Sequence, residues 1–147
     1  GGIGAKDVGV AAAKSKGAIP YSVTPDYTAK AREILGPEAW LCVEQKVCLT
    51  SIESEARNVA RKQMGRYLRW PNYINNWMRM GFKEADLEGH GSNNFLDAMV
   101  CWGSEKRIMS CLEEHFSSGA DHVVVQALKP DGGNGPDFSV LQALAPT

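Results

Sequence analysis

The chain lacks long apolar runs and a strong excess of charge of either sign. No stretch approaches the roughly 20 consecutive apolar residues that a membrane-spanning helix needs, and no basic-then-apolar leader opens the sequence. The 16 Lys and Arg against 17 Asp and Glu give a net charge of −1, too balanced to favour a nucleic-acid backbone. No N-x-[ST] glycosylation signal occurs. These absences predict a cytoplasmic globular protein with neither membrane nor nucleic acid as a partner.

The cysteines also exclude familiar site types. Cys42, Cys48, Cys101 and Cys111 form no C-x-x-C pair, and no histidine stands at zinc-ligand spacing from two of them. Cys42 and Cys48 fall in one predicted strand, whose extended backbone holds them too far apart to bridge. We therefore expect free, buried thiols in a reducing compartment. No Ser-His-Asp catalytic triad and no cluster of metal ligands stands out.

The sequence does contain an alternation of strands and amphipathic helices. Thr24-Pro25-Asp26 is a strong helix start, and Thr50 with Glu53 predicts a capping box for the longest helix. Residues 84–94 and 130–136 are predicted loops. Strands are predicted at residues 18–23, 40–49 and 122–128, and helices at residues 5–16, 24–35, 50–70, 72–80, 95–102, 103–118 and 138–145.

This alternation favours an α/β fold with a parallel sheet and right-handed crossovers. Three strands, with a fourth expected before Gly1, make four strand–helix units, half of an eight-stranded barrel that typically needs about 250 residues. We therefore predict a single domain over residues 1–147: the C-terminal half of a TIM-like (β/α)8 barrel. The first residue is Gly rather than Met, so processing, a tag remnant and truncation of a longer chain all remain open.

Several connected segments carry a resemblance to a known family. They are GGIGAK, KGAIPYSVTPDYTAKAREILGP, EQKVCLT with SIESEARNVARKQMGRYL, PNYINNWMRMGF and DAMVCWGSEKRIMSCLEEHFSSGADHVVVQAL. In this order and spacing they resemble the C-terminal half of the bacterial luciferase-like monooxygenases, in particular the branch of oxidoreductases that depends on the deazaflavin coenzyme F-420. The resemblance extends from Gly1 to about Leu128.

The resemblance implies a barrel that binds F-420 or FMN over its C-terminal mouth, where it transfers hydride or activates oxygen. It assigns Glu44, on the seventh strand, to catalysis. It assigns cofactor binding, mainly of the phosphate, to two short segments: Gly1, Gly2 and Gly4, and Tyr21, Ser22 and Thr24. Thr24 stands where some relatives have a phosphate-binding Lys and contributes no charge. The ring contacts and the proton donor of F-420 enzymes come mainly from the first half of the barrel, which has no counterpart here.

The residues themselves leave alternatives open. A glycine turn that opens a helix presents free N–H groups to an anion, but residues 1–4 are equally well a flexible start. Glu44 and Gln45 must point to opposite faces of their strand. Because a carboxylate inside a barrel is costly unless it is paired or hydrated, Glu44 is either a pocket residue, paired near Lys46, or at a sheet edge. His115 and His122 are expected to be structural or solvated.

Three hypotheses about the whole chain follow. It is the C-terminal half of a luciferase-like oxidoreductase, incomplete and inactive alone; or a non-catalytic half-barrel module; or a stable fragment. A half-barrel leaves open sheet edges and an uncovered apolar face. We therefore expect self-association into a homodimer or a higher assembly. The Trp and Tyr residues between positions 67 and 102 form either packing surface or an aromatic lid.

Overall fold

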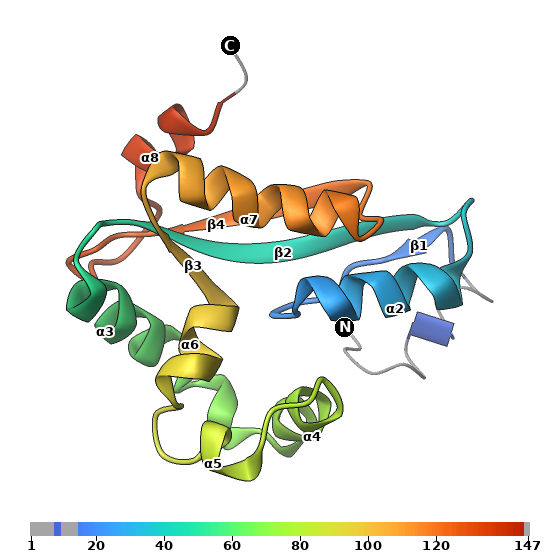
Figure 1. The fold of residues 1–147 in the computed structure, drawn as a ribbon, viewed down its shortest axis with the longest axis horizontal. Coiled ribbons are helices and arrows are strands. Elements are labelled where there is room, and N and C mark those ends of the chain that lie inside the picture. The colour runs from blue at the N-terminus through green and yellow to red at the C-terminus, as the bar shows by residue number, and fades with distance from the viewer. Residues whose placement is uncertain (1–7, 10–14, 146–147) are drawn as a thin grey trace.

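Four parallel strands form one sheet in the computed structural model, which describes residues 8–9 and 15–145 (Figure 1). They are β1 (Gly17–Ala18), β2 (Trp40–Leu49), β3 (Val100–Gly103) and β4 (His122–Leu128). β2 lies at the centre: its first two residues pair with β1, and its residues 42–48 pair with β4. β3 pairs with residues 46–49, so β3 and β4 occupy opposite edges of β2. The predicted parallel pairing is confirmed.

Helices cover both faces of this sheet. α2 (Pro25–Leu35), α7 (Glu105–Ser117) and α8 (Phe138–Ala143) pack on the face that carries Leu41, Val43 and Val47. The other face meets a helical layer of α3 (Glu53–Met64), the 3-10 turn η1 (Tyr67–Arg69), α4 (Pro71–Arg79), α5 (Glu84–Leu87) and α6 (Asn93–Met99). Figure 1 shows α3 to α6 gathered on one side of β2, with α7 along the other.

Strand alternation in β2 sorts its polar residues between these layers. Gln45 points toward α7, where it meets His115, whereas Glu44 and Lys46 point to the opposite face. Successive side chains of a strand project to opposite faces, so the expected separation of Glu44 from Gln45 is confirmed. The candidate site therefore begins on the α3–α6 face of β2.

The helix starts agree in part with the prediction. α2 begins as expected, because the Thr24 hydroxyl accepts the Tyr27 N–H at 3.3 Å. The capping box predicted from Thr50 is wrong. α3 begins at Glu53 after Ile52, and the Thr50 hydroxyl instead accepts the Ile52 N–H and donates to the Glu55 carboxylate. Thr50 lies too far ahead of the first turn to cap it.

The segment before α7 differs more strongly from the elements predicted for it. The helix predicted over residues 95–102 is shorter and earlier, Asn93–Met99, and the chain then forms β3. Part of the predicted loop at residues 84–94 is the short helix α5. Four residues are too few to show a strand period, and it is pairing with the edge of β2 that makes Val100–Gly103 extended.

One pair of cysteines corrects the expectation of free thiols. Cys101 in β3 and Cys111 in α7 form a disulfide, with their Cα atoms 6.5 Å apart. The sequence predicts both cysteines in helices. Cys101 lies in β3 instead, and α7 packs against this strand, which brings Cys111 within bonding distance of Cys101. Cys42 and Cys48 are free, as predicted.

Some predictions fall outside the described residues. Gly1, Gly2 and Gly4, and most of the helix predicted over residues 5–16, belong there. Within residues 8–9 and 15–145, no helix combines the length and apolar character needed to cross a membrane.

Candidate functional site

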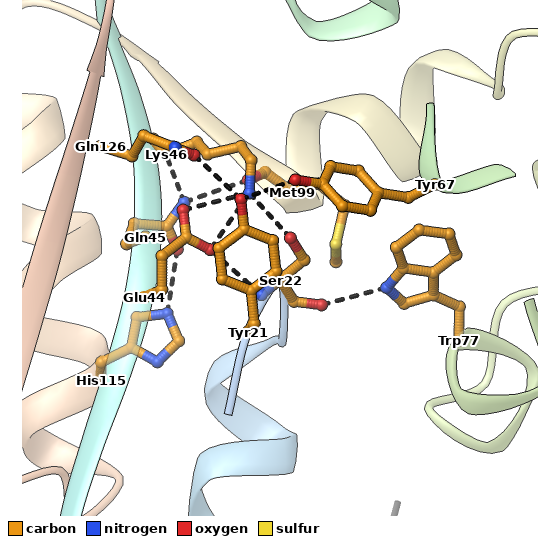
Figure 2. Close-up of polar contacts among 10 residues, drawn as sticks. All are labelled: Tyr21, Ser22, Glu44, Gln45, Lys46, Tyr67, Trp77, Met99, His115 and Gln126. Atoms are coloured by element: carbon orange, nitrogen blue, oxygen red, sulfur yellow. Dashed lines mark hydrogen bonds and ion pairs between the residues drawn. The ribbon is translucent and has the colours of Figure 1, made fainter. Parts of the chain in front are cut away.

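A buried ion pair forms the centre of the candidate site (Figure 2). The Lys46 ammonium lies 3.1 Å from both carboxylate oxygens of Glu44 and donates to the Ser22 hydroxyl at 2.8 Å. Lys46 is 1% exposed and Glu44 is 6% exposed. The two residues are two positions apart on β2 and therefore share a face.

Such a pair is stable only when its remaining hydrogen-bonding capacity is satisfied, because charges lose hydration on burial. Glu44 accepts a further bond from the Ser22 backbone N–H at 3.1 Å. The Lys46 nitrogen lies 4.0 Å from the centre of the Tyr21 ring, a cation–π contact. Burial lowers the pKa of Lys46, while the Glu44 carboxylate acts in the opposite direction.

Ser22 holds the pair in place with an unusual backbone. Its φ of 53° lies in the left-handed region, which costs a non-glycine residue about 1–2 kcal/mol. All three of its polar groups are occupied: the N–H by Glu44, the hydroxyl by Lys46, and the carbonyl by the Trp77 indole N–H at 3.0 Å. These bonds hold the turn between β1 and α2 in its strained conformation.

Two tyrosine hydroxyls lead away from the pair. The Tyr21 hydroxyl lies 2.9 Å from the Tyr67 hydroxyl and 3.2 Å from the Gln126 side-chain oxygen. That oxygen can only accept, so Tyr21 donates to Gln126 and accepts from Tyr67. Burial raises the pKa of Tyr21, and the Tyr67 hydrogen bond and the Glu44 charge act in the same direction. Gln126 is exposed, so the hydroxyls connect the surface with the neighbourhood of Lys46.

Aromatic rings cover the ion pair from the helical layer. Ring centres follow one another at 5.6 Å (Tyr21–Tyr67), 4.9 Å (Tyr67–Tyr73) and 5.5 Å (Tyr73–Trp77). Trp77 is fully buried. This part of the aromatic set is therefore packing surface, one of the two alternatives that the sequence left open.

A second buried network lies on the α2–α7 face. Nε2 of His115 lies 3.0 Å from the Gln45 side-chain oxygen, and Nδ1 lies 2.9 Å from the Thr28 hydroxyl. The Gln45 amide nitrogen donates to the Lys46 and Met99 carbonyls, which fixes its oxygen toward His115. The geometry assigns the proton of neutral His115 to Nε2. Burial lowers the pKa of His115 to about 4. His115 is therefore buried and hydrogen-bonded within the fold, not solvated.

The predicted site residues are only partly brought together. Glu44, Tyr21 and Ser22 share the cluster, whereas Thr24 lies at the start of α2 and caps it. Lys46 had been named only as an alternative partner of Glu44, and it proves to be the centre of the network. Its spacing of two from Glu44 in a strand was the available signal. Tyr67 was predicted only as part of a packing surface or an aromatic lid, and Gln126 was missed, because no local pattern brings residues from η1 and β4 together.

The predicted phosphate contacts are only partly available. The Ser22 hydroxyl and the Thr24 hydroxyl already hold other groups, so a phosphate would compete with those bonds. A cavity of about 260 Å³ opens beside Thr24, between α2 and α4, with the cations Lys30 and Arg79 in its wall. Asp26 and Glu33 also line it, so its charge is mixed. In the part of the chain that the structure describes, no group of three His, Cys, Asp or Glu residues could hold a metal.

The fold is similar to those of solved enzymes, although no protein-family model and no curated protein sequence matches the chain. The F-420-dependent tetrahydromethanopterin reductase of Methanopyrus kandleri aligns with a TM-score of 0.61 at 14% identity, over 97% of this chain and 47% of that one. An F-420-dependent secondary alcohol dehydrogenase, solved with an F-420–acetone adduct, gives a TM-score of 0.59 at 11% identity, over 84% and 41%. The apo form of MsnO8 gives 0.53 at 16%, over 99% and 50%.

These likenesses show the fold. The chain spans about half the length of the structures it matches. Its parallel sheet and covering helices are those of a TIM-barrel-like α/β fold, as in F-420-dependent enzymes with the luciferase-like architecture.

Proposed function

We propose that the chain is part of a luciferase-like oxidoreductase that uses a deazaflavin, coenzyme F-420, with FMN as the alternative cofactor. The observation that carries the proposal is the buried Glu44–Lys46 pair on one face of a parallel sheet whose fold aligns with two F-420-dependent enzymes. Structural ion pairs also occur in barrels, but this one lies against the Tyr21 ring, whose hydroxyl is hydrogen-bonded to Tyr67 and to the exposed Gln126.

The cofactor, when bound, would supply the hydride chemistry or the activation of oxygen. The residues of this chain would supply charge and proton transfer. Lys46 would supply a hydrogen-bond donor in a buried site, and the Glu44 carboxylate favours its charged form against the effect of burial. Glu44, the residue predicted to be catalytic, fixes the position of that ammonium, and Tyr21 with Tyr67 would orient polar groups between the ion pair and the surface.

We further propose that activity needs the rest of a barrel. The alignments leave about half of each matched enzyme without a counterpart in this chain. The missing part would come from additional residues of the same polypeptide or from a second chain. This fragment is therefore expected to bind cofactor weakly and to turn over little or not at all by itself.

The binding test is a fluorescence titration of F-420, and separately of FMN, with the full chain. A saturable change with F-420 supports the proposal, and saturation with FMN alone reassigns the cofactor. Replacing Glu44 with Gln should weaken binding or, in a completed barrel, turnover. Glu38→Gln is the matched control, because Glu38 is an exposed acid in the turn before β2 and is not among the residues bonded to the ion pair. Equal effects of the two substitutions would contradict a role for Glu44.

The alternative function, a non-catalytic module that self-associates, is favoured by one specific observation. The surface beside β1 exposes Ile19 (69%) and Trp40 (56%). Beside them is a mostly apolar hollow of about 500 Å³. Contiguous exposed apolar groups commonly mark an interaction surface, and a second copy of this chain is the partner that we propose for it.

Sedimentation of the full chain tests self-association. We expect a concentration-dependent dimer or larger species, and Trp40→Ser should shift it toward monomer. A folded monomer of the unmodified chain at micromolar concentration would contradict the proposal.

We also propose a cytoplasmic location, which the sequence predicts. The Cys101–Cys111 disulfide is an observation against that location, since such bonds are rare there.

A further inference from the structure

A second hollow lies at the carboxyl end of β4, apart from the ion pair. It has a volume of about 440 Å³ and lies between the C-terminal half of α3, residues 125–128 of β4 and the glycine-rich loop that follows β4. The loop turns back along β4, because the Asp137 N–H donates to the Ala127 carbonyl. The Lys62 ammonium donates to the Gly132 carbonyl and thereby links α3 to this loop.

The charged side chains that line this hollow all carry positive charge. They are Lys62 and Arg66 from α3 and the turn after it, and Lys129 from the end of β4. Among the described residues, no carboxylate lines the hollow, and none lies within 4.0 Å of these three cations. The one acid of the loop, Asp131, accepts the Gly133 N–H.

Some other basic residues of the chain are paired with acids. Arg32, Lys46 and Arg57 each form an ion pair with a carboxylate, which the three cations of the hollow do not do with any described residue. Lys62 and Arg66 instead line the same hollow with no carboxylate of the described residues between them, so their positive charges repel each other. A bound anion would remove that repulsion.

The cationic surface continues on the other side of the same two residues. A neighbouring hollow of about 600 Å³ is lined by Lys62 and Arg66 as well. Arg61, Arg69 and His90 also line it, and no carboxylate in the described part of the chain does. A ligand that carries more than one anionic group could therefore contact cations on both sides of α3.

We propose that the hollow between α3 and the 129–136 loop binds the phosphate group of a phosphorylated small molecule. Arginine and lysine side chains that converge without acidic partners are the groups that bind phosphate in proteins. The proposal rests on the charges and the hollow, and it is independent of the choice of cofactor.

The test is a titration of the ¹⁵N-labelled full chain with inorganic phosphate, and then with pyrophosphate, at constant ionic strength set with sodium chloride. We expect saturable shifts of the Gly132, Gly133 and Gly135 amides, with a Kd for pyrophosphate of about 1 mM or tighter. Lys62→Gln and Arg66→Gln should each weaken binding about five- to tenfold. Calorimetry on the same samples gives the affinities independently.

Lys106→Gln is the matched control, because Lys106 is an exposed cation on α7 outside both hollows. It should leave the affinity unchanged. The proposal is overturned if binding does not saturate, if Lys106→Gln weakens it as much as Lys62→Gln does, or if the shifts occur near Thr24 instead. Circular dichroism of each variant confirms that it folds, and the unmodified chain alone suffices for the first and third outcomes.

Discussion

Replacing Lys46 with Met should destabilise the protein more than replacing both members of its ion pair. The substitution keeps an unbranched side chain, one atom shorter than lysine, and removes the charge. It leaves the Glu44 carboxylate, 6% exposed, with the Ser22 N–H as its remaining described hydrogen bond. Breaking a buried pair by removing one partner costs about 3–5 kcal/mol, because the other charge stays buried without compensation.

The double variant, Glu44→Gln with Lys46→Met, carries no buried charge. Replacing a whole buried pair by neutral groups of similar volume is often close to neutral. We therefore expect the double variant to be more stable than Lys46→Met, with a coupling energy of at least about 2 kcal/mol between the two positions. Lys106→Met, at an exposed position of α7, is the control for loss of a lysine.

Urea unfolding followed by far-UV circular dichroism gives the free energy of unfolding of each variant. A domain of this size has about 5–15 kcal/mol in total, so Lys46→Met could be largely unfolded without urea; the double variant would then still fold. If each single substitution cost less than about 1 kcal/mol and the two effects added, the reasoning about the buried pair would be refuted.

Three further predictions concern other parts of the fold. Burial lowers the pKa of His115 from 6.5 to about 4, so the unfolded state binds more protons than the folded state between these pH values. The free energy of unfolding should therefore fall by about 3 kcal/mol as the pH drops from 6.5 toward 4. Urea unfolding at several pH values should show this decrease, and His115→Gln should lack it. Reducing the Cys101–Cys111 bond should lower the free energy of unfolding by about 2–3 kcal/mol. Mass spectrometry of the unreduced protein after thiol labelling should find two free thiols, and finding four would refute the disulfide. Ser22→Gly should be about 1 kcal/mol more stable than Ser22→Ala, because both lose the hydroxyl but only alanine keeps the strain at φ 53°; equal stabilities would argue against that backbone.

The sequence predicted those elements that local signals define. β2 and β4 have the predicted bounds, and α2 begins at its Thr-Pro-Asp start. β3 was missed because its extended shape depends on pairing with β2, which no local pattern encodes. The disulfide was missed for the same reason, since Cys101 meets Cys111 only when a strand stands in place of the predicted helix.

The candidate site shows the same limit. Glu44 was identified by the resemblance, and strand alternation correctly placed it opposite Gln45. Its bonds to Lys46 follow from a spacing of two in that strand. The contributions of Tyr67 and Gln126 depend on how η1 and β4 approach the turn after β1, and this long-range arrangement is not contained in a local sequence pattern.

The most direct measurement is the fluorescence titration of coenzyme F-420 with the full chain, in parallel with FMN. If the protein is part of a deazaflavin oxidoreductase, F-420 should show a saturable change that Glu44→Gln, or the double variant Glu44→Gln with Lys46→Met, weakens and that Glu38→Gln does not. No change with either cofactor, in a sample whose circular dichroism shows a folded protein, would contradict the assignment.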